Sequence, residues 1–414
     1  MPSASRAGLS YWPNGLPSSS NRSPSMRGPL PLVRHMPRPT GDVMKNTVKL
    51  LAAALYVLAA SACTSAPDRS NTVARREQEI RSRLDRDVPN LLAAYAIPSV
   101  SIAHVEADKL VFAAAYGSQS PGIPANTKTL YNIASLSKPI SAEVILQAAS
   151  RGQLTLDEPM YRYWVDPDIA NDERSKLLTP RLALSHQTGF PNWRSQTGRV
   201  LTFKRAPGEA FGYSGEGYEY VARFTEKRTA TDFEALAQNL VFDPIGMKET
   251  AYTERPWFDG RIAAPMDAQG KALKPQLTRK WVASDMIYTT ASDYARFMLS
   301  VMRGDRLAKG LANERSRVQV VERSAKCSTN QAPGCPDEAG FGLGWEVFRI
   351  GGELFLTHDG SDPGVSTFVY INLTKRNGTV ILTNSANGPR IVLPILDLLG
   401  ADPVFVECTR RETC

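Results

Sequence analysis

The interpretation of the fold depends on the segment Tyr131-Asn132-Ile133-Ala134-Ser135-Leu136-Ser137-Lys138-Pro139. The apolar residues around and after it predict a helix over 135–149, whose first turn tolerates Pro139. Ser135 and Lys138 are three positions apart, so they share one face of that helix. A serine needs a neighbouring base to act as a nucleophile, and burial lowers the pKa of a lysine toward that of a usable base. Alone the pair is a weak signal, because a capping serine followed by a solvated lysine has the same spacing.

Two later segments supply further groups of the kind that acyl transfer uses. Tyr213 lies in the glycine-rich stretch 207–218, and the segment Thr357-His358-Asp359-Gly360-Ser361 follows a predicted strand. A Ser-x-x-Lys pair, a tyrosine in a glycine-rich loop and His-x-Gly on a strand occur here in that order. In this order they resemble the three motifs of the serine β-lactamase and penicillin-binding protein superfamily. The branch that the chain resembles most is that of the class C β-lactamases, DD-peptidases and esterases.

The resemblance covers about 97–384. Further segments that match the family are 152–159, 184–190, 244–247, 289–295 and 341–345. It implies a serine hydrolase that forms an acyl-enzyme and hydrolyses an ester, amide or peptide carbonyl of a small molecule or peptide. This chemistry requires no metal and no organic cofactor.

The resemblance also implies a role for each matching residue. Ser135 would be the acylated nucleophile, Lys138 would take or relay its proton, and Tyr213 would be a second general base that moves a proton to the leaving group. Gly360 lets the strand backbone approach the substrate closely. The oxyanion hole would consist of the backbone N–H groups of Ser135 and Ser361.

Two positions depart from the family pattern. Gly215 stands where the family has the asparagine of Tyr-x-Asn, which bonds the substrate amide and orients the lysine. His358 stands where β-lactamases have lysine, so a fixed positive charge for a substrate carboxylate is missing at neutral pH. His358 would instead polarise Tyr213 or bind the polar end of the acyl group. Both departures favour an esterase or small peptidase and leave β-lactam turnover open.

The pattern of predicted elements indicates an α+β fold. Strands are expected near both ends of the domain, over 98–106, 109–117, 343–350, 353–358, 365–372 and 378–384, and helices over 75–94, 232–240, 292–302 and 390–399. The terminal segments would share one antiparallel sheet flanked by helices, with a mostly helical subdomain inserted over about 155–335. The hydrolase domain would span 73–414.

The N-terminal 72 residues have a different composition. Residues 1–43 hold eight Pro and eight Ser without a hydrophobic period, and we interpret them as a leader that results from a misplaced start site. Residues 44–62 resemble a signal peptide, followed by a tether over 63–72. Ala60-Ser61-Ala62-Cys63 resembles a lipobox without its usual leucine, so Cys63 would carry a lipid; an ordinary signal peptide cleaved after Ala62 is the alternative. The protein would be exported to the bacterial periplasm or envelope and contact the membrane only through this anchor.

Charge gives no indication of a nucleic-acid partner. The net charge is +8, but residues 1–62 hold seven Lys and Arg against one acid, so the remainder has 42 basic and 40 acidic residues. The basic excess therefore belongs to the N-terminal leader and does not form a surface for nucleic acid.

Four cysteines remain beyond Cys63. An even number in an exported chain indicates disulfides, and we prefer the local pairs Cys327–Cys335 and Cys408–Cys414 among the three connectivities. No CxxC, HxH or HExxH pattern accompanies them, which disfavours zinc.

Two other classes of protein would account for part of this sequence. A penicillin-binding-type protein with little turnover would explain Gly215 but not the intact Ser135, Lys138 and Tyr213. An α/β-hydrolase would use Ser214 in the stretch Gly212-Tyr213-Ser214-Gly215-Glu216, but the last glycine of that motif is missing and alternating βα units are absent. His186 is expected to brace its loop and not to react.

Overall fold

The computed structural model describes residues 69–304, 306–327 and 334–414. The predicted leader, signal peptide and Cys63 lie outside these residues. The helix α1 (Arg69–Tyr95) includes the last four positions of the predicted tether, and the rest of the tether lies outside the described residues. No helix in these ranges is long and apolar enough to cross a membrane.

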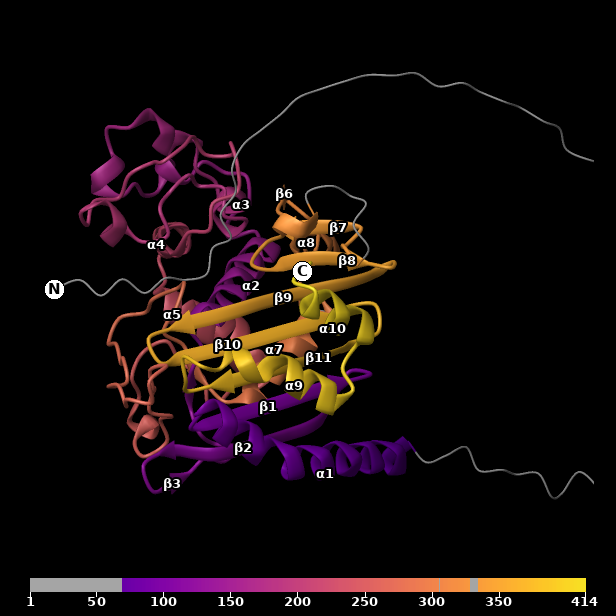
Figure 1. Cartoon of the computed structure of the whole chain (residues 1–414). Helices are drawn as coiled ribbons and strands as arrows, with labels where there is room; N and C mark the ends of the chain where they lie inside the picture. Colours follow the sequence, from indigo (N-terminus) through magenta and orange to yellow (C-terminus); the bar gives the residue numbers. More distant parts are fainter. Residues whose placement is uncertain (1–68, 305, 328–333) are drawn as a thin grey trace, which may run out of the picture. The chain divides into compact units, whose positions relative to one another are not determined.

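A nine-stranded antiparallel sheet dominates the unit formed by residues 73–414 (Figure 1). Its order is β3 (Ile123–Pro124), β2 (Lys109–Ser120), β1 (Ser99–Glu106), β11 (Asn377–Thr383), β10 (Val365–Asn372), β9 (Glu353–Asp362), β8 (Glu346–Ile350), β7 (Glu338–Phe341) and β6 (Val320–Val321). β1 pairs with β11, with Ile102 opposite Ile381. The first and last long strands are therefore neighbours, and this confirms the predicted α+β fold with a sheet shared by both ends of the chain.

The two faces of the sheet pack against different helices because side chains alternate along each strand. Val100 and Ile102 of β1 join the core formed with α1, α9 (Pro389–Leu399) and α10 (Pro403–Arg410). Ala103 and Val105 join the opposite core, which includes α2 (Ser137–Ser150) and α7 (Ala291–Arg303). In Figure 1, α9 and α10 lie in front of the sheet and α7 lies behind it.

The segment between α2 and β7 contains short helices joined by loops. They are α3 (Pro180–Leu184), α4 (Gly215–Thr229), α5 (Phe233–Ala237), α6 (Asp243–Ile245) and α8 (Lys309–Arg315), with several 3-10 turns. The short strand β5 (Tyr288–Thr289) pairs with β4 (Tyr131–Asn132), and β6 extends the main sheet.

Several boundaries differ from the sequence-based expectation. The predicted helix over 232–240 is α only to Ala237 and continues as a π-helical turn to Phe242. The glycine-rich stretch that holds Tyr213 becomes α4 from Gly215 onward, because the Ser214 side chain accepts a hydrogen bond from Gly217 N at 3.0 Å and caps the helix. β7 and α10 were not expected, and the strand predicted from residue 343 begins only at Glu346.

Two disulfides join Cys327 to Cys335 and Cys408 to Cys414, the local pairs that the sequence favoured. Among the described residues no cluster of three or more His, Cys, Asp or Glu side chains has a geometry for a metal ion.

Candidate active site

Ser135 lies at the junction between the small sheet and α2. Ser135 is the middle residue of the 3-10 turn η1 (Ala134–Leu136). The α-helix that was expected to begin at Ser135 begins two residues later, at Ser137. Ala134 has a φ of +47°, a left-handed conformation that is costly for a residue with a Cβ. The Asn132 side chain stabilises this turn by accepting a hydrogen bond from Ala134 N at 2.7 Å.

Lys138 is buried beside Ser135, with 1% of its surface exposed. Its Nζ donates hydrogen bonds to Ser135 Oγ and to the Ser284 carbonyl, each at 2.9 Å. Burial lowers the pKa of Lys138 to about 8, against the opposing effect of the Asp285 and Glu219 charges. A substantial fraction of this amine is therefore neutral near pH 8, and a neutral amine has a lone pair that can accept a proton.

Tyr213 precedes α4 and is the third predicted residue that the structure brings to this place. Its ring centroid is 4.8 Å from Lys138 Nζ, and its hydroxyl interacts with the Ser135 side chain. Burial raises the pKa of Tyr213 well above its usual value. The phenol of Tyr213 therefore keeps its proton at neutral pH. It can donate this proton to another group only if it receives a proton in return.

His358 reaches the same site from β9. Its ring centroid lies 6.3 Å from that of Tyr213. Nδ1 lies 2.6 Å from the Asp359 carbonyl, which can only accept, so Nδ1 carries the proton and Nε2 carries the lone pair. Burial and the charge of Lys138 lower the pKa of His358 to about 3. The imidazole is thus neutral and supplies no fixed positive charge.

Gly360 is the closest point of contact between β9 and η1. A Cβ at this position would lie 2.3 Å from Thr367 Oγ1, 2.6 Å from the Ile133 carbonyl and 3.1 Å from Ser135 N. Ser361 follows it and has an exposed side chain in register with Ser366 of β10. The absence of a side chain at 360 lets the strand lie directly against the turn of the serine.

Replacing Gly360 with alanine should lower kcat/KM about 100-fold, because the new methyl group would push β9 away from Ser135 N and small displacements of a reacting group are costly. Hydrolysis of an activated ester and the rate of Ser135 labelling would measure this. Gly310→Ala is the matched control, since a Cβ there meets no atom within 4 Å. Equal rates for both variants would contradict the predicted close approach.

Packing explains why position 215 holds a glycine. A Cβ here would lie 2.8 Å from the nearest atom of the Trp193 ring, and Asn192 Oδ1 accepts a hydrogen bond from Gly215 N at 2.8 Å. Trp193 therefore occupies the space into which a side chain at 215 would extend. The sequence identified Gly215 as a departure from the family pattern. It did not indicate a role for Trp193, which lies 22 positions earlier in the chain.

Several polar residues around Lys138 were missed by the sequence-based reasoning. Glu219 Oε1 accepts hydrogen bonds from Ser284 N at 2.9 Å and Ser284 Oγ at 2.6 Å. Asp285 and Asp362 share a hydrogen bond, and burial raises the pKa of both, to about 8 for Asp362. These residues lie outside the three motifs, and no pattern in the sequence marks them.

His186 packs directly against the tyrosine. Its Nδ1 accepts a hydrogen bond from Ser214 N at 3.1 Å, and its ring centroid is 4.3 Å from that of Tyr213. These contacts fit the bracing role expected for this residue.

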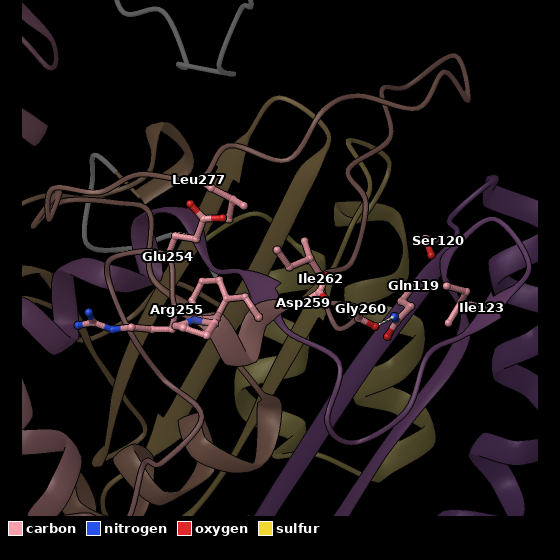
Figure 2. A pocket seen from close by; sticks show the side chains of 11 residues that line it. Gln119, Ser120, Ile123, Glu254, Arg255, Asp259, Gly260, Ile262 and Leu277 are labelled. Carbon is pink, nitrogen blue, oxygen red and sulfur yellow. Dashed lines mark hydrogen bonds between the residues drawn. The ribbon is translucent and has the colours of Figure 1, made fainter.

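Pocket size does not locate this site. A pocket of about 420 Å³ is lined by Gln119 and Ile123 at one edge of the sheet and by the loop that includes Arg255 and Gly260, and none of the predicted site residues lines it (Figure 2). A smaller pocket of about 250 Å³ is lined partly by Gly360 and Ser361. The site is defined by the converging side chains and not by a hollow in the surface.

Comparisons with known proteins agree with this fold. A family model described as Beta-lactamase matches residues 84–401. Penicillin-binding protein 4 of Amycolatopsis lactamdurans is 24% identical over 322 residues, which cover 71% of this chain and 82% of that protein. The D-alanyl-D-alanine-carboxypeptidase/endopeptidase AmpH of Escherichia coli is 22% identical, covering 73% and 83%. The solved structure of a D-alanine carboxypeptidase AmpC from Burkholderia cenocepacia superposes with a TM-score of 0.63 at 22% identity, covering 77% of this chain and 99% of that one.

Proposed function

The chain belongs to the Beta-lactamase family, and from this we propose that it is a serine hydrolase that forms an acyl-enzyme on Ser135. The observation that carries the proposal is the 2.9 Å contact between Ser135 Oγ and the buried amine of Lys138. A buried lysine with a pKa of about 8 is matched to proton transfer near neutral pH.

The proposed reaction has two halves. Neutral Lys138 takes the Ser135 proton as Oγ attacks the carbonyl carbon, and the resulting oxyanion binds the backbone N–H groups of Ser135 and Ser361, each such donor being worth roughly 3 kcal/mol. Tyr213 then gives its proton to the leaving amine or alcohol and regains one from Lys138. Water then attacks the acyl-enzyme and gives a proton to the neutral base. The base passes this proton to Ser135 Oγ as the acyl–oxygen bond breaks, which releases the acid and regenerates free Ser135.

The substrate that we favour is an ester or a small peptide. Gly215 has no side chain to bind a substrate amide, and His358 is neutral, so a substrate carboxylate meets no positive charge from either position. The alternative is a true β-lactamase, or a penicillin-binding-type protein with little turnover. The relative named as a penicillin-binding protein supports this alternative, whereas the relative named as a D-alanyl-D-alanine-carboxypeptidase/endopeptidase supports a peptide substrate.

Exposing the chain to a penicillin and to an activated ester separates these functions. Intact mass over time would reveal an adduct on Ser135, and drug loss would reveal turnover. Ester hydrolysis without a penicillin adduct supports the esterase, a long-lived adduct supports the penicillin-binding protein, and drug loss that needs Ser135 supports the β-lactamase. Reaction with neither probe would contradict the proposed hydrolase.

The rate of acylation should rise with pH through about 8 and level off above about 9. The lysine must be neutral to accept the proton, and burial places its pKa at about 8, so the reactive fraction grows as the pH rises toward and past that value. Labelling of Ser135 by an uncharged fluorophosphonate between pH 6 and pH 10 measures this. A rate that does not change over this range would contradict Lys138 as the base.

We also propose that the protein is exported and works in the bacterial periplasm or envelope, anchored through a lipid on Cys63. The two disulfides support an oxidising compartment. Mass measurement of the N-terminal peptide from cells of the source bacterium would test the lipid. No nucleic-acid partner is proposed.

A further inference from the structure

We propose that Glu219 is a positioning residue for Lys138 and that it acts through Ser284. This inference rests on the proposed function of the Ser135–Lys138 pair. It assigns a task to a partly buried carboxylate outside the three motifs.

The first step concerns the direction of the lysine lone pair. A neutral amine has two N–H groups and one lone pair, and as a base it must point the lone pair at the Ser135 hydroxyl. The other hydrogen bond that Nζ makes is to the Ser284 carbonyl, at 2.9 Å. With one N–H donated to this carbonyl, the rotation of the amine is restricted, so the placement of the carbonyl decides where the lone pair points.

The second step concerns what places that carbonyl. Glu219 Oε1 accepts both the backbone N–H and the hydroxyl of Ser284, at 2.9 and 2.6 Å. The preceding carbonyl, that of Ala283, accepts a hydrogen bond from Ser141 Oγ on α2. Met286, two residues later, has a φ of +67°. The segment 283–286 therefore has an unusual backbone path that side chains from α2 and α4 stabilise.

The third step concerns α4. Gly215 at its start has no side chain, and Trp193 fills the space beside it. Glu219 lies four residues later, on the same face of the helix. From α4, Glu219 reaches the surroundings of Lys138 through Ser284, and the Tyr218 ring centroid lies 5.9 Å from Lys138 Nζ.

The charges around Lys138 allow the contribution of Glu219 to be measured through the pKa of the lysine. Carboxylates of Glu219, Asp285, Asp362 and Asp359 raise the pKa of Lys138, while the nearby His358 and His186 are neutral because burial lowers their pKa values. Burial raises the pKa of Glu219 itself. Removing its charge should lower the pKa of Lys138, whereas neutralising a buried carboxylate that is not among the charges acting on Lys138 should leave that pKa unchanged.

The test uses the labelling of Ser135 by a fluorophosphonate in the whole chain. Glu219→Ala should lower the maximal labelling rate about tenfold to a hundredfold, with a half-saturating concentration within about twofold of the parent. Glu219→Gln keeps an oxygen for Ser284 and should recover most of the rate. The acid limb of its pH profile, which is the range over which the labelling rate rises with pH, should move to lower pH by about half a unit to one unit. The reason is that one carboxylate no longer favours the ammonium form of Lys138.

Asp293→Asn and Asp293→Ala are the matched controls. Asp293 of α7 is a buried carboxylate that likewise accepts one backbone N–H and one hydroxyl, from Glu249 N at 2.7 Å and Thr250 Oγ1 at 3.0 Å, and it also pairs with Arg296. Melting temperatures of all variants report folding. The controls should leave the labelling rate and its pH profile unchanged when corrected for the folded fraction.

Three results would overturn the inference. They are an unchanged rate in Glu219→Ala, an unshifted acid limb in Glu219→Gln, and equal effects from the Asp293 variants. Failure of the proposed function is distinct, since the unmodified chain would then show no labelling that depends on Ser135.

Discussion

Replacing Ser135 with alanine is expected to abolish covalent labelling and to reduce hydrolysis by at least about 1,000-fold. The alanine removes the only oxygen that Lys138 contacts in η1, while the backbone of the turn, the oxyanion donors and the sheet remain in place. Any residual rate would come from substrate binding and the oxyanion hole alone. Intact mass after treatment with a fluorophosphonate, and initial rates on an activated ester, measure the two effects.

Ser214→Ala is the informative control for this variant. Ser214 Oγ donates to the Pro191 carbonyl at 2.7 Å and accepts from Gly217 N at 3.0 Å, so its oxygen is engaged in capping α4. The variant should lose about 1 kcal/mol of stability and keep its labelling. An adduct on Ser214, or full activity in Ser135→Ala, would overturn the assignment of Ser135 as the nucleophile.

Replacing Lys138 with methionine is expected to lower the acylation rate at least about 1,000-fold and to remove its rise through pH 8. Methionine has a similar length and no charge, so it fills the buried space but cannot accept the Ser135 proton. It leaves the Ser284 carbonyl without its lysine donor and the Asp285 carboxyl without a neighbouring cation. The chain should nevertheless fold, because the lysine itself is costly to bury.

The pH profile of labelling distinguishes a lost base from a lost structure. A misfolded variant would show a lower melting temperature and a lowered rate at every pH, whereas a variant without its base should show a low rate that no longer depends on the lysine titration. Lys375→Met removes a lysine that pairs with Glu353 and Asp402 and should leave the profile unchanged. A preserved acid limb near pH 8 in Lys138→Met would show that another group is the base.

Much of the fold could be predicted because its signals are local. The runs of apolar residues in β2 and in β9 to β11 follow from burial on both faces of a sheet. Both disulfides were predictable because each closes a short loop. The start of α4 was not, since Gly215 and Gly217 lower helix propensity and the stabilising cap of Ser214 overrides them.

Some residues of the candidate site could likewise be predicted from the sequence, and others could not. Ser135, Lys138, Tyr213, His358 and Gly360 were identified from motifs, and the structure brings them together. Trp193, Glu219 and Ser284 were not identified, because their positions depend on contacts between segments far apart in the sequence. The neutral state of His358 also follows from burial, which a single sequence does not reveal.

The pairing of β1 with β11 has a consequence for how the chain reaches its active form. The central strands of the sheet come from opposite ends of the domain, so β1 has no partner on that side until residues 377–383 have been synthesised. Contacts of such long sequence separation slow folding and leave strand edges exposed meanwhile. Because β9, which carries His358 and Gly360, is also made late, a chain cut short before this region would expose unpaired edges and contain no assembled site. The complete sheet, and with it the candidate site, can therefore form only after residues 377–383 have been synthesised.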